Sequence, residues 1–429
     1  MSERKGSNRR EFLKTSSTLA TAAALAGGLS VARGAHAAGS DAIKAVVIGC
    51  GGRGTGAGAD CLNADPGVRI IALADAFENR AKGAADYYRR EFKDRADVPQ
   101  DRVFVGLDAF QKAIACNPDL VIIAGPPGFR PQQYSAAIAA GKHVFMEKPC
   151  CVDAPGYRTL VAANKMADEK GLRVGVGLQR HHDAGYQKGI EEIQAGKYGD
   201  ILFMRAYWNG SDIWYRGREK GMNELQFQVH NWYHFAWLSG DNIGEQHIHN
   251  LDVCNWVKND HPIEANGMGG CSIRYAGDRK GMGQIFDHHF VEFTYKDGSK
   301  MFSQCRHMPN TWNNVSEAVH GTKGAGGPTA SGGKKLQFQN PYVQEHYDLI
   351  QAIRNGTKHN EGHYGATSSM TAVLGRMATY SGQVIKWDEA VAKGPDEAPD
   401  YLTWNDKPPV VPNSDGNYPI PVPGVFKPY

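Results

Sequence analysis

The segment Ile43–Gly54, with the sequence IKAVVIGCGGRG, decides the fold of this chain. Its first six residues form a largely apolar run rich in β-branched side chains, which predicts a buried parallel strand. Three glycines follow with the spacing GxGxxG: Gly49, Gly51 and Gly54. The first glycine allows a tight turn, the second lets the backbone approach a pyrophosphate, and the third lets a helix pack on the strand. The segment therefore predicts a dinucleotide site, with Gly52 and Arg53 in the same loop.

An acidic residue follows the second predicted strand. The run Val68–Ala74 ends at Asp75, 21 residues after Gly54. A carboxylate at this position accepts hydrogen bonds from the adenosine ribose hydroxyls and repels a 2′-phosphate, so NAD is favoured over NADP. Arg53 and Arg80 lie close enough in the sequence to leave NADP open.

Strand-like and helix-like segments keep alternating up to residue 177. Further buried strands are predicted at residues 120–124, 143–146 and 173–177, with helical segments between them. Such alternation predicts parallel βαβ units with right-handed crossovers. We therefore expect an α/β fold in which residues 42–177 form a Rossmann domain that binds NAD. A doubly wound sheet without a dinucleotide is the alternative.

Two groups of residues fall at the carboxyl ends of predicted strands, where ligands bind in open α/β sheets. Pro126 and Pro127 follow the fourth strand, where a rigid turn can press on the dinucleotide. Glu147, Lys148 and Pro149 follow the fifth strand. We expect Lys148 to project toward the nicotinamide and Glu147 to line the same site.

The order of these motifs resembles the glucose-fructose oxidoreductase, inositol dehydrogenase and MocA (Gfo/Idh/MocA) family. The resemblance continues through residues 178–201 and 345–390. It implies a second, substrate-binding α/β domain over residues 178–390, with a large open, mostly antiparallel sheet. It also implies a sugar or polyol substrate and association into homo-oligomers. Strand-like runs that fit this sheet occur at residues 202–208, 264–275, 284–295 and 300–305.

The segment Gly244–Trp256, GEQHIHNLDVCNW, is similar to a motif of the second domain in that family. The family motif is Asp-x-x-x-His, and its histidine faces the hydroxyl that is oxidised. Glu245 and His249 have this spacing, with Glu in place of Asp. On one helix they would share a face, so Glu245 would orient His249. Because oxidation of an alcohol needs a base with a pKa near neutrality, we predict this role for His249, with Lys148 as its partner.

Other polar residues are candidates for substrate or metal contact. Arg180, His181, Tyr186 and His247 are predicted to contact the substrate, with an acid partner for Arg180 and core packing of Tyr186 or His247 as alternatives. Zinc sites need three or four suitably arranged ligands, and the histidines occur only in scattered pairs, so no metal site is predicted. Residues 207–234 are rich in Trp, Tyr, Asn and Arg, which favours sugar binding over a purely structural loop.

Both ends of the chain differ in composition from the rest. Residues 1–38 combine Arg9 and Arg10 with a moderately apolar stretch and a small-residue site. This pattern resembles a twin-arginine signal peptide and predicts a periplasmic or otherwise exported protein, with a disordered basic tail or a membrane anchor as alternatives. Residues 391–429 are proline-rich and predict an extended arm. We expect the arm to pack on its own domain or on a neighbouring subunit, with equal weight.

Composition limits the class of protein. A hydrophobic content of 41%, a charged content of 22% and a net charge of +3 fit a soluble globular protein, with neither nucleic acid nor, in the mature form, a membrane as a partner. The eight cysteines contain no CxxC pair and are predicted to be mostly small core residues.

The expected compartment bears on the reaction. Outside the cytoplasm little free NAD is available for exchange. We therefore predict an NAD(P)-dependent oxidoreductase that acts on a sugar, polyol or glycoside with a tightly bound, recycled cofactor. A redox-neutral, NAD-dependent glycoside hydrolase or lyase is one alternative, and a non-catalytic sugar- or NAD-binding protein is another.

Overall fold

The computed structural model describes residues 42–275, 279–400 and 403–429, and residues 42–429 form one compact unit. The predicted signal peptide, residues 1–38, lies outside the described residues. Within the described residues, no helix is both long enough and apolar enough to cross a membrane. All eight cysteines are free, and six of them are buried.

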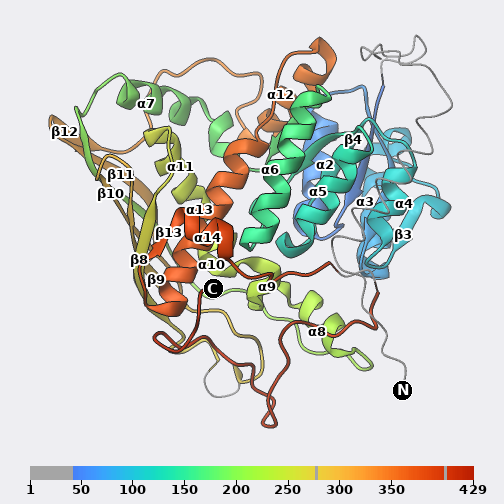
Figure 1. The fold of residues 1–429 in the computed structure, drawn as a ribbon. Coiled ribbons are helices and arrows are strands. Elements are labelled where there is room, and N and C mark those ends of the chain that lie inside the picture. The colour runs from blue at the N-terminus through green and yellow to red at the C-terminus, as the bar shows by residue number, and fades with distance from the viewer. Residues whose placement is uncertain (1–41, 276–278, 401–402) are drawn as a thin grey trace. The chain divides into compact units, whose positions relative to one another are not determined.

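The first sheet has the predicted Rossmann form, with six parallel strands in the order β3-β2-β1-β4-β5-β6 (Figure 1). Its strands are β1 (Ile43–Ile48), β2 (Val68–Asp75), β3 (Val103–Val105), β4 (Leu120–Ile123), β5 (His143–Met146) and β6 (Val174–Val176). The order reverses between β1 and β4, which is where such sheets bind ligands. The helices that connect the strands are α2 (Gly52–Ala64), α3 (Glu78–Phe92), α4 (Ala109–Ala115), α5 (Arg130–Ala139) and α6 (Ala154–Glu169).

Both faces of this sheet are buried, which explains the near-continuous apolar run in β1. Ala45 and Val47 belong to a core with α2 and α3, whereas Val46 and Ile48 belong to a core with α4, α5 and α6. Successive side chains of a strand point to opposite faces, so one short run of sequence supplies both cores.

The second sheet has seven strands in the order β12-β11-β7-β10-β9-β8-β13, and every pair except β7 with β10 is antiparallel. The strands are β7 (Ile201–Gly210), β8 (Glu264–Gly270), β9 (His288–Thr294), β10 (Lys300–His307), β11 (Asn314–Gly321), β12 (Gly324–Gly326) and β13 (Ile385–Lys386). The expected open, mostly antiparallel sheet is therefore confirmed. β8 and β9 are shorter than predicted, and the sequence did not predict β11, β12 or β13.

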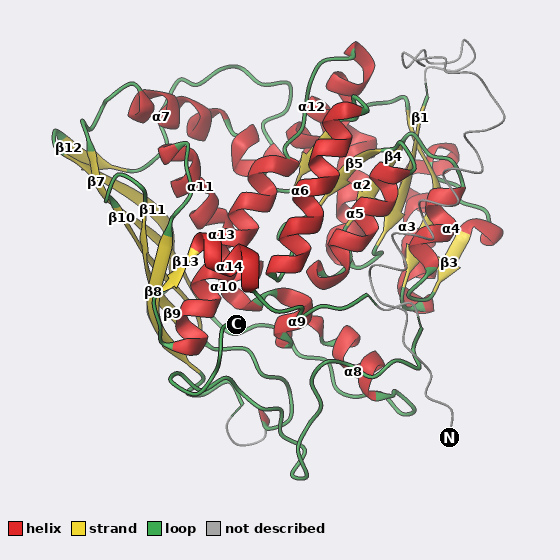
Figure 2. Cartoon of the chain, in the orientation of Figure 1, coloured by secondary structure: helices red, strands yellow, loops and turns green. Residues whose placement is uncertain are grey.

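Helices cover the inner face of the second sheet, as Figure 2 shows. α11 and α13 supply apolar side chains to the core beneath β7, β9 and β10. The remaining helices are α7 (Ala184–Gln194), α8 (Glu224–His230), α9 (Ala236–Ser239), α10 (Asp241–Glu245), α11 (Ile248–Lys258), α12 (Pro341–Asn355), α13 (Gly362–Ser381) and α14 (Trp387–Lys393). Short 3₁₀ turns lie at residues 93–95, 100–102, 127–129, 179–182 and 232–234.

The first domain is completed by a helix from far along the chain. α12 lies within the predicted second domain, residues 178–390, yet Leu349 and Ile350 are fully buried in the core formed by β1 and α2. Arg354 adds a two-pronged contact to Asp65, with Nε 2.9 Å from Oδ2 and Nη2 2.8 Å from Oδ1. A division at residue 177 therefore leaves out part of the first domain.

The proline-rich C-terminal arm packs on its own chain. Tyr418 is buried against Phe235 at a ring distance of 4.9 Å, and its hydroxyl donates to Glu224. The ring of Trp404 lies 5.5 Å from that of Phe77. Of the two alternatives predicted for the arm, the structure contains the one in which it lies on its own chain.

His182 generates a prediction about stability and pH. Its Nδ1 lies 2.7 Å from Asp348 of α12 and its Nε2 2.9 Å from Glu361. Burial opposes the charged imidazole, but the two carboxylates outweigh burial and raise the pKa of His182 to about 10. Since the pKa is raised in the folded state, the contribution to stability is complete below about pH 6.5 and is lost as the pH rises toward 10.

We expect the free energy of unfolding of the wild type to fall between about pH 7 and pH 10, and that of His182→Gln to start lower and vary less. Urea unfolding at several pH values measures both. His363→Gln, which alters an exposed histidine–aspartate pair, is the control and should follow the wild type. A His182→Gln curve parallel to the wild type would contradict the assignment.

Candidate active site

The glycine loop has the geometry that a dinucleotide requires. Gly49 has a φ of +89°, and a Cβ on Gly54 would lie 1.7 Å from the Gly49 carbonyl oxygen, so neither position accepts a side chain without backbone movement. By contrast, a Cβ on Gly51 or Gly52 would meet no atom within 4 Å. These two glycines lie where α2 begins, and free N–H groups at a helix start bind phosphate.

A cavity of about 830 Å³ lies over this loop. The residues predicted to bind the cofactor that line it are Gly49, Gly51, Gly52, Arg53, Gly54, Asp75 and Pro126. Asp75 ties the end of β2 to the loop, because its Oδ2 accepts from the Cys50 N–H at 2.6 Å and its Oδ1 from the Phe77 N–H at 2.8 Å. Burial raises the pKa of Asp75. The loop, the helix start and this carboxylate together fit a bound dinucleotide.

Arg53 and Glu147 form an ion pair between the glycine loop and the end of β5. The Nε of Arg53 lies 2.7 Å from Oε1 of Glu147, and its Nη2 lies 3.0 Å from Asp60. The guanidinium also lies 5.0 Å above the ring of Tyr342. Arg53 therefore holds Glu147 in place and lines the cavity.

A second cavity of about 390 Å³ adjoins the first and shares Arg53, Ala124, Gly125 and Trp232 with it. Lys148, at the end of β5, lies in this cavity and donates from Nζ to the backbone carbonyl of Glu245. Nζ also lies 3.2 Å from Oε1 of Glu245. Both side chains are about nine-tenths buried, at 11% and 12% exposure. Lys148 is thus oriented from the second domain by a residue at the end of α10.

The prediction that Glu245 orients His249 is wrong. It assumed one helix, but α10 ends at Glu245 and α11 begins at Ile248. The Asn242 carbonyl accepts from the N–H groups of both Gln246 and His247, so the turn widens between the two helices. Glu245 consequently faces Lys148.

His249 lines the second cavity as an uncharged imidazole. It is 6% exposed, its ring stacks at 6.0 Å on Trp208, and its Nδ1 has no hydrogen-bond partner among the described residues. Burial lowers the pKa of His249 well below its usual value, and the cations Lys148 and Arg180 lower it further. His249 therefore does not have the near-neutral pKa that a base needs. The difference from the prediction comes from the deep burial of the ring, which the sequence does not reveal.

Arg180 also lines the second cavity. It is paired with an acid, which is the alternative that the sequence left open for this residue. It forms an ion pair with Glu317 of β11 and donates to the His249 carbonyl at 3.1 Å. Tyr186 donates to the other oxygen of Glu317 at 3.1 Å, and it is not among the residues that line the cavity. Arg180 and Glu317 thus fix the backbone of His249, and Tyr186 supports them.

Two further predicted substrate contacts, besides Tyr186, lie outside the second cavity. His181 is stacked between two aromatic rings, with its Nε2 2.8 Å from Asp252. His247 is fully buried, with its Nε2 2.7 Å from the hydroxyl of Ser303. Direct substrate contact by either histidine is therefore corrected to a structural role, because neighbouring polar groups of the second domain already bind them.

Several residues that line the cavities were not predicted individually. Trp208 and Trp232 come from the segment 207–234, but Trp214 and Arg216 of the same segment line the dinucleotide cavity instead. The segment therefore covers the cofactor site as well as the substrate site. Tyr342 enters the second cavity from α12, and no signal in the sequence connects it with residues near the N-terminus. Across residues 42–275, 279–400 and 403–429, no group of three His, Cys, Asp or Glu side chains could hold a metal ion.

Comparison with known proteins agrees with this geometry. Residues 43–178 match the GFO_IDH_MocA model, described as an oxidoreductase family with an NAD-binding Rossmann fold. The Rossmann domain of this chain is thus similar to that of this family. Inositol 2-dehydrogenase from Klebsiella pneumoniae (strain 342) is 27% identical over 218 residues, which are 51% of this chain and 55% of that protein. The chain thus spans about half the length of the curated relatives it matches.

Solved structures share the two-domain fold of this chain over a longer range. Scyllo-inositol dehydrogenase from Lactobacillus casei with bound NAD(H) and scyllo-inositol is 18% identical and has a TM-score of 0.61, covering 81% of this chain and 99% of that one. Aldose-aldose oxidoreductase from Caulobacter crescentus, complexed with glycerol, is 17% identical with a TM-score of 0.61, covering 80% and 99%. At these identities the likeness concerns the fold of both domains.

Two substitutions in the glycine loop should separate an effect on dinucleotide binding from an effect on stability. We expect Gly51→Ala to keep its thermal midpoint within about 2 °C of the wild type and to weaken NAD binding at least tenfold, since the added methyl group enters only the cavity. Gly54→Ala should lower the midpoint markedly, because its Cβ meets the Gly49 carbonyl. Differential scanning calorimetry and NAD titration measure the two effects. Equal NAD affinity in Gly51→Ala and the wild type would contradict the assigned cavity.

Proposed function

We propose that this protein is an NAD-dependent oxidoreductase that oxidises or reduces a secondary alcohol of a sugar or polyol. The observation that carries the proposal is the position of Lys148. Its Nζ lies in the cavity that adjoins the dinucleotide site, and Glu245 binds it from the second domain. A buried amine oriented in this way suits proton transfer next to a cofactor.

The residues around Lys148 have different roles in the reaction. Bound NAD supplies the acceptor for the hydrogen and electron pair that leave the substrate carbon. In the reductive direction the ammonium of Lys148 gives a proton from Nζ to the carbonyl oxygen, and in the oxidative direction the deprotonated amine takes up the hydroxyl proton. Glu245 orients Nζ. His249 stays uncharged and offers a ring nitrogen to the same hydroxyl. Arg180 fixes the His249 backbone, so the imidazole stays aligned with Lys148.

The second cavity suits an uncharged, hydroxylated ring. Three of its four cations are matched by acids in ion pairs: Arg53 with Glu147, Lys148 with Glu245, and Arg180 with Glu317. The fourth, Arg130, donates to the backbone carbonyls of Pro149 and Gly125. Its aromatic side chains are Trp208, Trp232 and Tyr342, which can pack on the C–H face of a sugar or cyclic polyol. The names of the inositol and aldose relatives support the same substrate class.

The segment 207–234, supported by the C-terminal arm, lies at the dinucleotide cavity. This arrangement supports a cofactor that stays bound through many turnovers. Trp214 and Trp232 line that cavity, and the guanidinium of Arg216 lies 3.8 Å from the centre of the Trp214 ring. The C-terminal arm supports this segment, because Asn223 donates to the carbonyl of Trp404 at 2.8 Å. Release of the dinucleotide would require these segments to move. Native mass spectrometry of the purified protein tests retention, and protein free of nicotinamide would contradict it.

Export and self-association complete the proposal. The twin-arginine-like residues Arg9 and Arg10 support export to the periplasm, and cell fractionation tests it. The outer face of the second sheet carries Phe203 and Phe302, whose rings lie 5.7 Å apart, and Met268 is 72% exposed. Such an apolar face supports homo-oligomers. Light scattering on Met268→Glu tests this, with dissociation as the expected result.

We expect Lys148→Ala to lower kcat/KM by about 10²–10⁴-fold on the substrate while leaving NAD binding within about twofold, because Lys148 handles the proton. Inositols, aldoses and aryl glycosides are the substrates to screen. Lys112→Ala, at an exposed site on α4, is the control. Unchanged turnover in Lys148→Ala would contradict the assignment. Cleavage of an aryl glycoside without added cofactor would replace net oxidoreduction with redox-neutral hydrolysis.

A further inference from the structure

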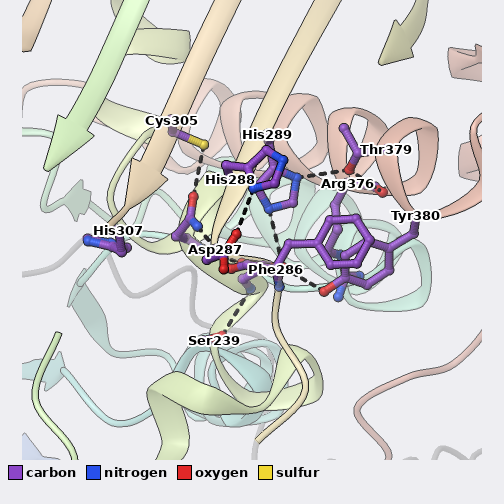
Figure 3. Close-up of polar contacts among 12 residues, drawn as sticks. Ser239, Phe286, Asp287, His288, His289, Cys305, His307, Arg376, Thr379 and Tyr380 are labelled. Carbon is purple, nitrogen blue, oxygen red and sulfur yellow. Dashed lines mark hydrogen bonds and ion pairs between the residues drawn. The ribbon is translucent and has the colours of Figure 1, made fainter. Parts of the chain in front are cut away.

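A buried charged cluster lies behind the active site, at the start of α10 (Figure 3). Its centre is Asp241, which is fully buried. The Oδ2 atom of Asp241 accepts from the Tyr380 hydroxyl at 2.6 Å and from the Phe286 N–H at 2.9 Å, and it lies 3.3 Å from Nε2 of His289. The cluster thus joins α10 to β9 and α13. None of its members lines either cavity.

The ring of His289 is held between α13 and α10. Its Nδ1 lies 2.9 Å from the Thr379 hydroxyl, which also donates to the Arg376 carbonyl at 3.1 Å. Its Nε2 faces the carboxylate of Asp241 at 3.3 Å. Figure 3 shows the contact between His289 and Thr379.

The backbone at Asp241 explains why a buried carboxylate with several contacts is placed there. Gly240 has a φ of +77° and Asp241 a φ of +68°, so two consecutive residues are left-handed and the second is not glycine. A non-glycine residue adopts this conformation at an energetic cost, and surrounding contacts must hold it. The bonds to the Asp241 carboxylate are such contacts. Asn242 adds two more, accepting from the thiol of Cys305 at 2.9 Å and donating to the Phe286 carbonyl at 3.3 Å.

This anchored turn leads directly to the active site. α10 begins at Asp241 and ends only four residues later at Glu245. The backbone carbonyl and the carboxylate of Glu245 both bind Nζ of Lys148. A helix of five residues has no length over which to absorb a displacement, so a shift at Asp241 reaches Glu245 almost unchanged.

We propose that the buried Asp241 carboxylate, with its contacts to Tyr380 and His289, is a positioning device for Lys148. It holds the first turn of α10 against β9 and α13, and so sets the position of Glu245 relative to Nζ of Lys148. The inference rests on the proposed role of Lys148 for its effect on turnover. Its effect on the contact between Lys148 and Glu245 is independent of that role.

The test compares Asp241→Asn with His288→Gln. His288 is the neighbouring residue on β9, is also paired with an aspartate and lies on the other face of the sheet, so it is the matched control. The first readout is the rate at which an amine-reactive reagent modifies Lys148, followed by peptide mapping with Lys112 as the internal reference. A lysine that has lost its contacts with Glu245 is more accessible to the reagent, so we expect modification to be about threefold faster or more in Asp241→Asn and unchanged in His288→Gln.

The second readout is turnover on a substrate from the screen. We expect kcat to fall about tenfold in Asp241→Asn, with the affinity for NAD unchanged. If Asp241→Asn does not fold, Tyr380→Phe removes one hydrogen bond to the same carboxylate and should give an intermediate rate of Lys148 modification. Wild-type modification of Lys148 in whichever of these variants folds would overturn the proposal. If the wild type turns over no substrate, the proposed function fails, and the modification rates still decide the role of Asp241.

Discussion

The contact between Lys148 and Glu245 is the interaction on which the site depends. Lys148 stands at the end of a strand of the first sheet, and Glu245 ends a short helix that packs beneath the second sheet. The contact therefore joins the cofactor-binding domain to the domain that supplies the other wall of the substrate cavity. Because both side chains are largely buried, neither charge could be kept there without the other.

Two other ion pairs lie near this contact, and each also joins two different elements of the fold. Arg53 links the glycine loop to Glu147, and Arg180 links a turn after the first sheet to Glu317 in the second. Each pair joins two elements that are distant in sequence. The cavity consequently keeps polar groups at defined positions, and acids neutralise all of its cations except Arg130, which suits recognition of hydroxyl groups.

The sequence predicted the parts of the structure that depend on local pattern. The glycine spacing, the buried strands and the position of Lys148 at a strand end follow from residues that are close neighbours in the chain. The break between α10 and α11 could not be predicted, because it depends on the backbone at Asn242, whose carbonyl accepts from two successive N–H groups, and no local sequence pattern marks it. For the same reason the partner of Glu245 was misassigned. His181 and His247 carried the right chemistry for a site, and only tertiary contacts reveal that they are used elsewhere.

The position of α12 has a consequence for the order in which the chain can fold during synthesis. The ribosome delivers all six strands of the first sheet by residue 176, but the helix that covers part of one sheet face begins at Pro341. Until then, the apolar surface later covered by Leu349 and Ile350 has no partner from its own domain. One face of the first sheet therefore stays partly uncovered in the nascent chain until most of the second domain has been synthesised.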